Sequence, residues 1–277
     1  MRIKRYGTKA AAAASLMLLL FFVLFPFLQM LSTSLKPADE LFTVPPEWVP
    51  NRVTMDNYLA ALEHRQFVRY FINSLVVSVV TCVLVIAVSV LAAYGFTRLE
   101  FPGRKFWLGF ILVSQMFCVS AIIIPLYKLM GALGLLNSYT GLILAYMAFT
   151  VPVAIWLLRG FMLGIPADME ESAMTEGASK IGAFFRVVVP LLRPGIGATA
   201  AYVFLITWQE FLFALVFMTA PENRTLPIGI MDFKGQYETN WGTMMAASVL
   251  ISIPVFLLFL FIQKQLISGL TEGATKG

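Results

Sequence analysis

Histidine, cysteine and charged residues are all scarce in this chain of 277 residues, and each shortage argues against a class of function. The one histidine, His64, has no partner cluster, and the two cysteines, Cys82 and Cys118, lie inside apolar runs without metal-ligand spacing. A membrane-embedded enzyme would need a cluster of metal ligands or a nucleophile beside a base, which these residues do not supply. The net charge of +5 comes without a basic stripe interleaved with aromatics, so no nucleic-acid partner is expected.

Charged residues make up 13% of the chain, well below the ~25% of ordinary soluble domains. Hydrophobic residues make up 59%, more than a soluble domain of this size could hide, so the composition predicts an integral membrane protein. Six apolar runs are long enough to span a bilayer as helices, and they predict an all-α, single membrane domain over residues 1–277. The runs are approximately residues 10–31, 71–96, 106–127, 139–158, 195–219 and 243–262.

Lysine and arginine are shared unevenly between the segments that connect these runs. Most of the 20 lie in the N-terminus, in the connection between the second and third runs, in residues 159–194 and in the C-tail. Because cytoplasmic segments carry an excess of Lys and Arg, we expect both termini and residues 159–194 to be cytoplasmic. Residues 32–70 and 220–242 are then expected on the outer side.

The segment 159–194 is polar and charged although it lies between apolar runs. Asp168 can cap a first helix through a capping-box spacing with Glu171. Gly177 suits a left-handed turn at the end of that helix, and Ser179 can cap a second one. The segment is therefore expected to form a bent pair of short helices.

This predicted pair carries the large apolar side chains Met174, Phe184 and Phe185 beside the small Ala173. Such a combination is typical of a helix that docks in a groove of another protein. The alternative, a linker that lies on lipid headgroups, stays open, although such helices usually carry Lys and Arg on their polar face. Acidic residues dominate the first helix instead: Asp168, Glu170, Glu171 and Glu176.

The same segment resembles the EAA motif of the inner-membrane subunits of binding-protein-dependent ABC importers. That motif is Glu-Ala-Ala, three residues, Gly, nine residues, then Ile-x-Leu-Pro, and the chain has Glu171-Ser172-Ala173, Gly177 and Val187-Val188-Val189-Pro190 at the same spacing. Ser172, Val187 and Val189 are conservative departures. The resemblance implies coupling helices that dock on a nucleotide-binding subunit. The residues it implicates are Glu171, Ala173, Met174, Gly177, Phe184, Phe185 and Pro190.

Two further segments are similar to the carbohydrate (MalG-like) branch of these permeases. The C-tail is similar to a GLTxGxxKG ending, which implies contact with the ATPase through Gly269, Leu270, Thr271, Gly273 and Lys276. The last outer loop is implied to probe the sugar cleft of an extracytoplasmic binding protein through Gln236, Tyr237, Asn240, Trp241 and Gly242. From the residues alone, an aromatic belt at the membrane interface explains this loop equally well.

The resemblance implies a permease subunit that forms half of the translocation pathway for a sugar. The implied partners are a second permease, a nucleotide-binding ATPase dimer that carries ATP-Mg, the binding protein and membrane lipid. No GxxxxGK[ST] sequence is present, so we expect ATP hydrolysis on the separate subunit, with no cofactor, metal or catalytic residue in this chain. The implied location is the cytoplasmic (inner) membrane of a bacterium or archaeon, multi-pass. A glycerol-phosphate or polyol importer remains open.

Glu210 is the only ionisable residue deep within an apolar run. With Gln209 it can form a polar wall of the translocation path, or it can contact the partner permease. An ion-coupled secondary transporter is the alternative from another class, but it usually needs several intramembrane polar or charged groups.

Residues at both ends of the second run are interpreted as helix-end anchors. Asn73 and Ser74 begin this run, and Tyr94 and Arg98 end it.

Overall fold

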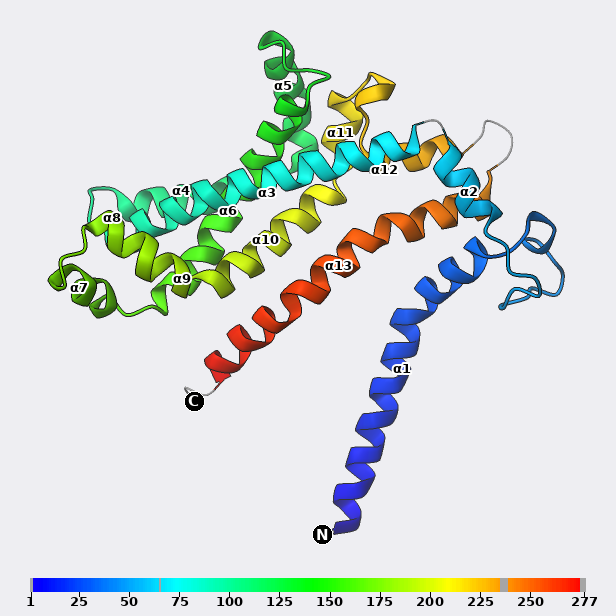
Figure 1. Ribbon diagram of the computed structural model, residues 1–277, viewed down its shortest axis with the longest axis horizontal. Helices are drawn as coiled ribbons and strands as arrows, with labels where there is room; N and C mark the ends of the chain where they lie inside the picture. Colours follow the sequence, from blue (N-terminus) through cyan, green and yellow to red (C-terminus); the bar gives the residue numbers. More distant parts are fainter. Residues whose placement is uncertain (1, 65, 235–238, 275–277) are drawn as a thin grey trace. The chain divides into compact units, whose positions relative to one another are not determined.

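Helices dominate the computed structural model, which describes residues 2–64, 66–234 and 239–274, with side chains from residue 12 to residue 263 (Figure 1). Within the described residues the backbone forms no strand, and the pairing of Lys234 with Thr239 is an isolated bridge. The predicted all-α membrane fold is confirmed.

Four of the described helices are long and apolar enough to cross a membrane. They are α1 (Arg2–Ser34), α3 (Phe67–Arg98), α6 (Tyr139–Leu163) and α13 (Trp241–Ala274). Two bent pairs raise the number to six if each counts as one span. One pair is α4 (Arg104–Ser114) with α5 (Val119–Ala132), bent by 99°, and the other is residues 180–191 with α10 (Arg193–Trp208), bent by 70°.

Two expected spans are not single helices, which corrects the sequence analysis. The run 106–127 is interrupted at residues 115–118, and the run 195–219 is interrupted after Trp208 and resumes in α11 (Leu212–Phe217). Hydropathy averaged over a window locates the apolar residues without locating a break in the backbone, although Gln115 in the first run and Gln209 and Glu210 in the second lie at the breaks.

The remaining elements are short. They are η1 (Ala38–Glu40), α2 (Asp56–Glu63), α7 (Asp168–Thr175), α8 (Lys180–Ala183), the π-helical η2 (Phe184–Val188), α9 (Val189–Leu191), η3 (Pro221–Asn223), α12 (Leu226–Gly229) and η4 (Ile230–Phe233).

The chain divides into two compact units. The first unit comprises residues 1–68 and 229–253, and its connection after α1 is held by polar contacts. The hydroxyls of Ser34 and Tyr58 are 2.7 Å apart, and Asn57 Nδ2 donates to the carbonyls of Ser34 and Lys36 at 3.0 and 2.7 Å. These contacts fix α2 against the end of α1.

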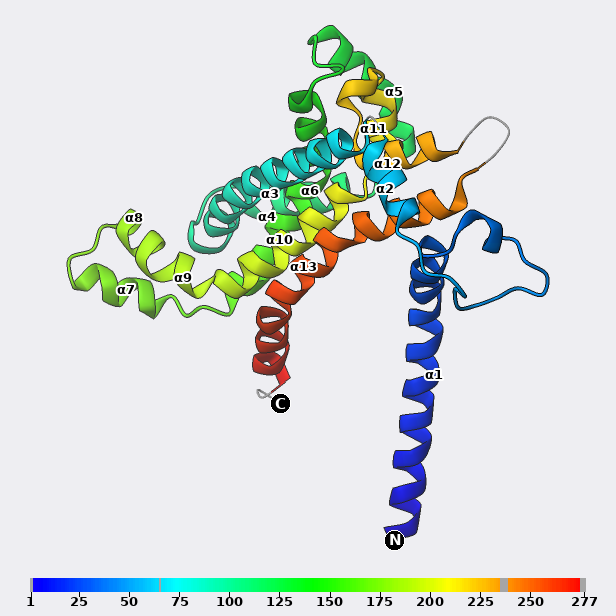
Figure 2. The ribbon, with the colours of Figure 1, turned by 45° about the vertical axis from the view of Figure 1, so that its right-hand side comes forward.

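The second unit comprises residues 69–228 and 254–277, and its core forms around α6. Helix α10 packs along α6, and the two lie side by side in both ribbon views (Figures 1 and 2). One apolar cluster joins α6 to α5 and α11 through residues that include Leu142, Tyr146 and Phe217. A second cluster joins the other end of α6 to α3 and to the segment 184–192.

Candidate functional site

The segment from the last turn of α6 to the start of α10 (residues 159–194), which we call the coupling segment, contains the expected bent pair of helices. Its first helix, α7, begins at Asp168 and not after it, because the amides of Glu170 and Glu171 donate to the carbonyl of Ala167 at 2.9 and 3.2 Å. The cap position thus belongs to Ala167, whose methyl side chain cannot accept a hydrogen bond, and the predicted capping box is wrong. The acidic residues still lie in the first turn, where they interact favourably with the helix dipole.

The turn between the two helices is formed as the sequence predicts. Gly177 has a φ of +96°, its amide donates to the carbonyl of Met174 at 3.0 Å, and the amide of Ala178 donates to that of Ala173 at 3.0 Å. These two bonds are those of a Schellman motif. Ser179 Oγ then accepts from the amide of Gly182 at 3.1 Å, which confirms the predicted cap of the second helix.

The second helix of the coupling segment is divided between the core and the surface. Phe184 is buried in the cluster with Leu158 and Val188, whereas Phe185 and Ile181 are exposed. The sequence analysis treats Phe184 and Phe185 alike, but the structure separates them: Phe184 holds the segment to the bundle, and Phe185 remains on the surface. Pro190 lies at the start of α9, where its missing N–H is tolerated.

The first helix offers further apolar surface beside its acidic face. Met174 and Met169 are exposed, Ala173 is half-buried, and Glu171 is exposed. Met169 and Ile181 add to the exposed surface but are absent from the residues that the motif implicates. Their exposure could have been suspected from helical spacing around the motif.

A buried ion pair fastens α7 to the end of α3. Arg98 Nε lies 2.5 Å from Glu170 Oε1, and Arg98 Nη2 donates to the carbonyl of Ile165 at 2.7 Å. Tyr94 donates its hydroxyl proton to Glu170 Oε2 at 3.1 Å, and its ring packs edge-on against Phe184 with centroids 4.7 Å apart. Tyr94 and Arg98 are thus more than the helix-end anchors expected from the sequence, because they join three segments of the chain.

Sequence reasoning missed this pair because 72 residues separate its members. The available signal was weak: an acidic residue next to the EAA-like motif and an arginine at the end of a span, both on the side predicted to be cytoplasmic. Pattern alone does not show that Glu170 is 6% exposed.

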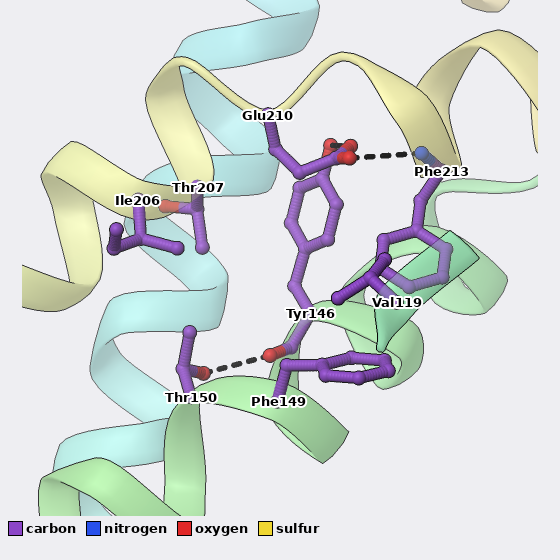
Figure 3. A pocket seen from close by; sticks show the side chains of 8 residues that line it. All are labelled: Val119, Tyr146, Phe149, Thr150, Ile206, Thr207, Glu210 and Phe213. Atoms are coloured by element: carbon purple, nitrogen blue, oxygen red, sulfur yellow. Dashed lines mark hydrogen bonds between the residues drawn. The ribbon is translucent and has the colours of Figure 1, made fainter. Parts of the chain in front are cut away.

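Glu210 lies in the break between α10 and α11, where its side chain caps the N-terminus of α11. Its carboxylate accepts from the amides of Phe213 and Ala214 at 2.8 and 3.2 Å and from the hydroxyl of Tyr146 at 2.8 Å (Figure 3). Amides in the first turn of a helix lack partners within it, so this carboxylate satisfies two of them where the span is interrupted. The structure gives Glu210 a capping role that the sequence analysis did not consider.

Glu210 and Tyr146 also border a cavity of about 130 Å³ (Figure 3). Figure 3 shows the Tyr146 ring rising from α6 toward the Glu210 carboxylate, with Phe149 and Phe213 beside it. The cavity is smaller than the roughly 300–1,000 Å³ of most ligand pockets. Whether Gln209, which is exposed, and Glu210 line a solute path remains a prediction.

The described part of the last loop borders a larger cavity within the first unit. Trp241 and Asn240 line a space of about 620 Å³ with Phe42 and Asp232, and Asn240 Oδ1 accepts from the amide of Thr243 at 3.1 Å. Of the other residues predicted for this loop, Gln236 and Tyr237 lie outside the described residues. Gly242 is pressed against α2, where an added Cβ would lie 2.5 Å from Asn57 Oδ1.

The C-tail predictions are not tested by contacts. Residues 269–273 continue α13, but their side chains lie outside the described part of the chain, as does Lys276 altogether.

Residues 85–272, which contain the coupling segment, the Arg98–Glu170 pair and Glu210, match the family described as binding-protein-dependent transport system inner membrane component. The chain belongs to this family. The chain is thus a multi-pass permease component of a transport system, in a family whose members are not themselves enzymes. The resemblance drawn from the EAA-like motif is confirmed.

Permeases of this family with named roles are similar over nearly the whole chain. The sulfoquinovosyl glycerol transport system permease protein SmoH of Agrobacterium fabrum is 40% identical over 92% of this chain and 89% of its own length. The diacetylchitobiose uptake system permease protein DasC of Streptomyces coelicolor is 36% identical over 92% of both chains. The trehalose/maltose transport system permease protein MalG of Thermococcus litoralis is 37% identical over 92% of both chains.

Solved structures agree on the fold of this permease. A bacterial ABC transporter involved in the import of the acidic polysaccharide alginate has a TM-score of 0.83 at 21% identity, over 95% of this chain and 98% of that chain. The bacterial alginate ABC transporter in complex with an alginate pentasaccharide-bound periplasmic protein has a TM-score of 0.69 at 15% identity, over 94% of both.

Proposed function

We propose that this chain is a permease subunit of an ABC importer and forms half of the pathway for a sugar that an extracytoplasmic binding protein delivers. Family membership supports the architecture. The class of solute is supported by relatives whose names carry sulfoquinovosyl glycerol, diacetylchitobiose and trehalose or maltose. These solutes differ from one another, so their names support carbohydrate as a class and no individual sugar.

The observation that carries the coupling role is the coupling segment itself. It is held to the bundle by buried contacts of Glu170 and Phe184, while Glu171, Met174 and Phe185 remain on the surface. A rigid helical pair with an acidic and apolar outer face suits docking in a groove of a nucleotide-binding subunit. The chain has no phosphate-binding GxxxxGK[ST] sequence, which supports ATP-Mg binding and hydrolysis by a separate ATPase dimer.

The same segment supports the proposed membrane orientation. Its four Lys and Arg residues, with those of the N-terminus and the α3–α4 connection, support a cytoplasmic coupling segment and cytoplasmic termini. The loop that contains Trp241 then faces the binding protein, and its cavity beside Phe42 and Asp232 supports a contact there. A second permease completes the pathway, because six spans form one half of it.

ATP-driven import is tested with the purified complex in proteoliposomes. We expect ATPase activity that the solute-loaded binding protein stimulates, and uptake that requires ATP on the cytoplasmic side and persists when ion gradients are dissipated. Uptake that follows an ion gradient without ATP would contradict the proposal and favour a secondary transporter. A screen of the binding protein against sugars, polyols and glycerol phosphates identifies the solute class.

A further inference from the structure

We propose that Arg98 is a positioning residue that locks the coupling helix α7 to α3, and that α3 carries the movement of α7 to residues 222–226 at its opposite end. This proposal rests on the proposed coupling role of α7. It adds a route by which docking at one end of the permease acts on the other.

The lock at the first end holds both helices of the coupling segment. Arg98 and Tyr94 lie one turn apart on α3, and both contact the carboxylate of Glu170 in α7. Arg98 also holds the carbonyl of Ile165, just before α7, while the Tyr94 ring packs against Phe184 just after α8. Any displacement of the coupling segment relative to α3 would have to break these contacts together.

The ion pair between Arg98 and Glu170 makes separation of α7 from α3 unfavourable. The side chains of Arg98 and Glu170 are 14% and 8% exposed, so separating them would leave two charges with little access to water. Unpaired buried charges are strongly unfavourable, and charge-assisted hydrogen bonds are among the stronger ones in proteins. The pair therefore favours joint movement of α7 and the end of α3.

The opposite end of α3 is fastened by a second set of buried polar contacts. Asn73 Nδ2 donates to the carbonyls of Glu222 and Arg224 at 3.0 and 2.9 Å, and Asn73 Oδ1 accepts from the hydroxyl of Tyr139 at 2.7 Å. Ser74 Oγ accepts from the amide of Leu226 at 2.7 Å. Residues 222–226 are thus tied to α3, and through Asn73 to the start of α6.

Between these two ends α3 has the features of a stiff connection. It is continuous from Asn73 to Arg98, a length of roughly 38 Å at 1.5 Å per residue. Among the four long helices described, α1, α6 and α13 each contain a proline, whereas α3 contains none. Because proline is a frequent cause of helix kinks, α3 is the long helix best suited to transmit a displacement.

The test of the first end measures solute molecules imported per ATP hydrolysed by assembled complexes in proteoliposomes. Arg98→Gln and Glu170→Gln are each expected to lower this ratio several-fold, and the double variant no further than either single one. Arg98→Lys, which keeps the charge but loses the planar donor fork, is expected to fall between. A lost pairwise contact is non-additive in this way, whereas unrelated effects would multiply. A wild-type ratio in either single variant, or a multiplied loss in the double one, would overturn the lock.

The contacts at the Asn73 end of α3 are tested by comparing two buried serines that lie one turn apart on this helix. Ser74→Ala removes the acceptor for Leu226, whereas Ser78→Ala removes a hydroxyl that has no hydrogen-bond partner among the described residues. We expect Ser74→Ala and Asn73→Ala to lower the ratio of import to ATP hydrolysis and Ser78→Ala to leave it at the wild-type value. An unchanged ratio in Ser74→Ala and Asn73→Ala would overturn transmission along α3.

The wild-type complex separates failure of this proposal from failure of the proposed function. If the wild type shows no ATPase stimulation by its loaded binding protein, the coupling role of α7 is wrong and the lock has nothing to transmit. If stimulation is normal and the variants keep the wild-type ratio, the function stands and the lock is wrong.

Discussion

Glu170 and Glu171 are neighbours in α7 but face opposite environments. Glu170 is buried against Arg98 and Tyr94 of the same chain, whereas Glu171 is exposed on the outer face of the coupling segment. The two adjacent carboxylates thus lie on different faces of α7. The inner one holds the helix to the membrane bundle, and the outer one is free to meet a partner.

Reversal of the outer charge should weaken docking without unfolding the permease. We expect Glu171→Lys to reduce co-purification of the ATPase subunit and substrate-stimulated ATPase activity, because it places a positive charge at the first turn of a helix and reverses the docking face. The thermal stability of the isolated permease should change little, since exposed substitutions usually alter stability by less than ~0.5 kcal/mol. Normal assembly and stimulation would show that Glu171 does not face the ATPase.

The turn between the two coupling helices should depend on glycine. At a φ of +96° any side chain is strained, so we expect Gly177→Asp to destabilise the turn by roughly 1 kcal/mol or more and to uncouple ATP hydrolysis from uptake. Gly109→Ala is the control, since Gly109 lies within α4, outside the coupling segment, has nothing within 4 Å of an added Cβ and has a helical backbone. Uptake and ATPase stimulation of both variants are compared in proteoliposomes; equal behaviour would contradict a role for this turn.

Glu210 should tolerate loss of its charge better than loss of its hydrogen bonds. Glu210→Gln keeps an acceptor for the amides of α11 and is expected to retain much of the uptake, because ATP drives transport. Glu210→Leu leaves the amides of Phe213 and Ala214 without an acceptor, which costs about 1–3 kcal/mol per unsatisfied buried group. Melting temperatures in detergent and uptake rates measure the two effects. Abolished uptake in an assembled Glu210→Gln complex with proton-coupled flux in the wild type would instead favour an ion-coupled transporter.

Deletion within the last outer loop should weaken the interaction with the binding protein and leave the other functions of the permease intact. Deletion of residues 236–240 is expected to leave membrane insertion and ATPase docking intact, since the deleted residues lie outside the coupling segment. The concentration of loaded binding protein needed for half-maximal ATPase stimulation, measured in lipid nanodiscs, should rise, or the maximal stimulation should fall. An unchanged curve would show that this loop is an interfacial anchor.

Elements that depend on local chemistry could be predicted from the sequence. The apolar runs located every long helix, Gly177 was recognised as a left-handed turn, and Ser179 as a cap. In each case the determining residues lie within one turn or one run of the chain. The Asp168 cap was predicted wrongly, because the first residue of α7 depends on the backbone hydrogen bonds to the carbonyl of Ala167, which side-chain preference does not fix.

Features that depend on distant partners could not be predicted. The breaks at residues 115–118 and 209–211 lie in runs whose average hydropathy is that of one apolar span, and the polar residues Gln115, Gln209 and Glu210 alone do not predict a break there. Glu210 is stabilised there by Tyr146, 64 residues away, and Glu170 by Arg98, 72 residues away. Hydropathy reports the solvent that a residue prefers, whereas these contacts depend on which helices become neighbours.

The break at Glu210 also constrains how the protein is made. Helix α11 has six residues, far fewer than the ~20 that cross a bilayer, so it is too short to be inserted as an independent span. Its first amides are satisfied by Glu210, whose third donor, Tyr146, belongs to α6. The start of α11 thus depends on a residue of α6, and α6 is synthesised before α10 and α11. We therefore expect α11 to reach its final position only after α6 is in the bilayer to supply Tyr146.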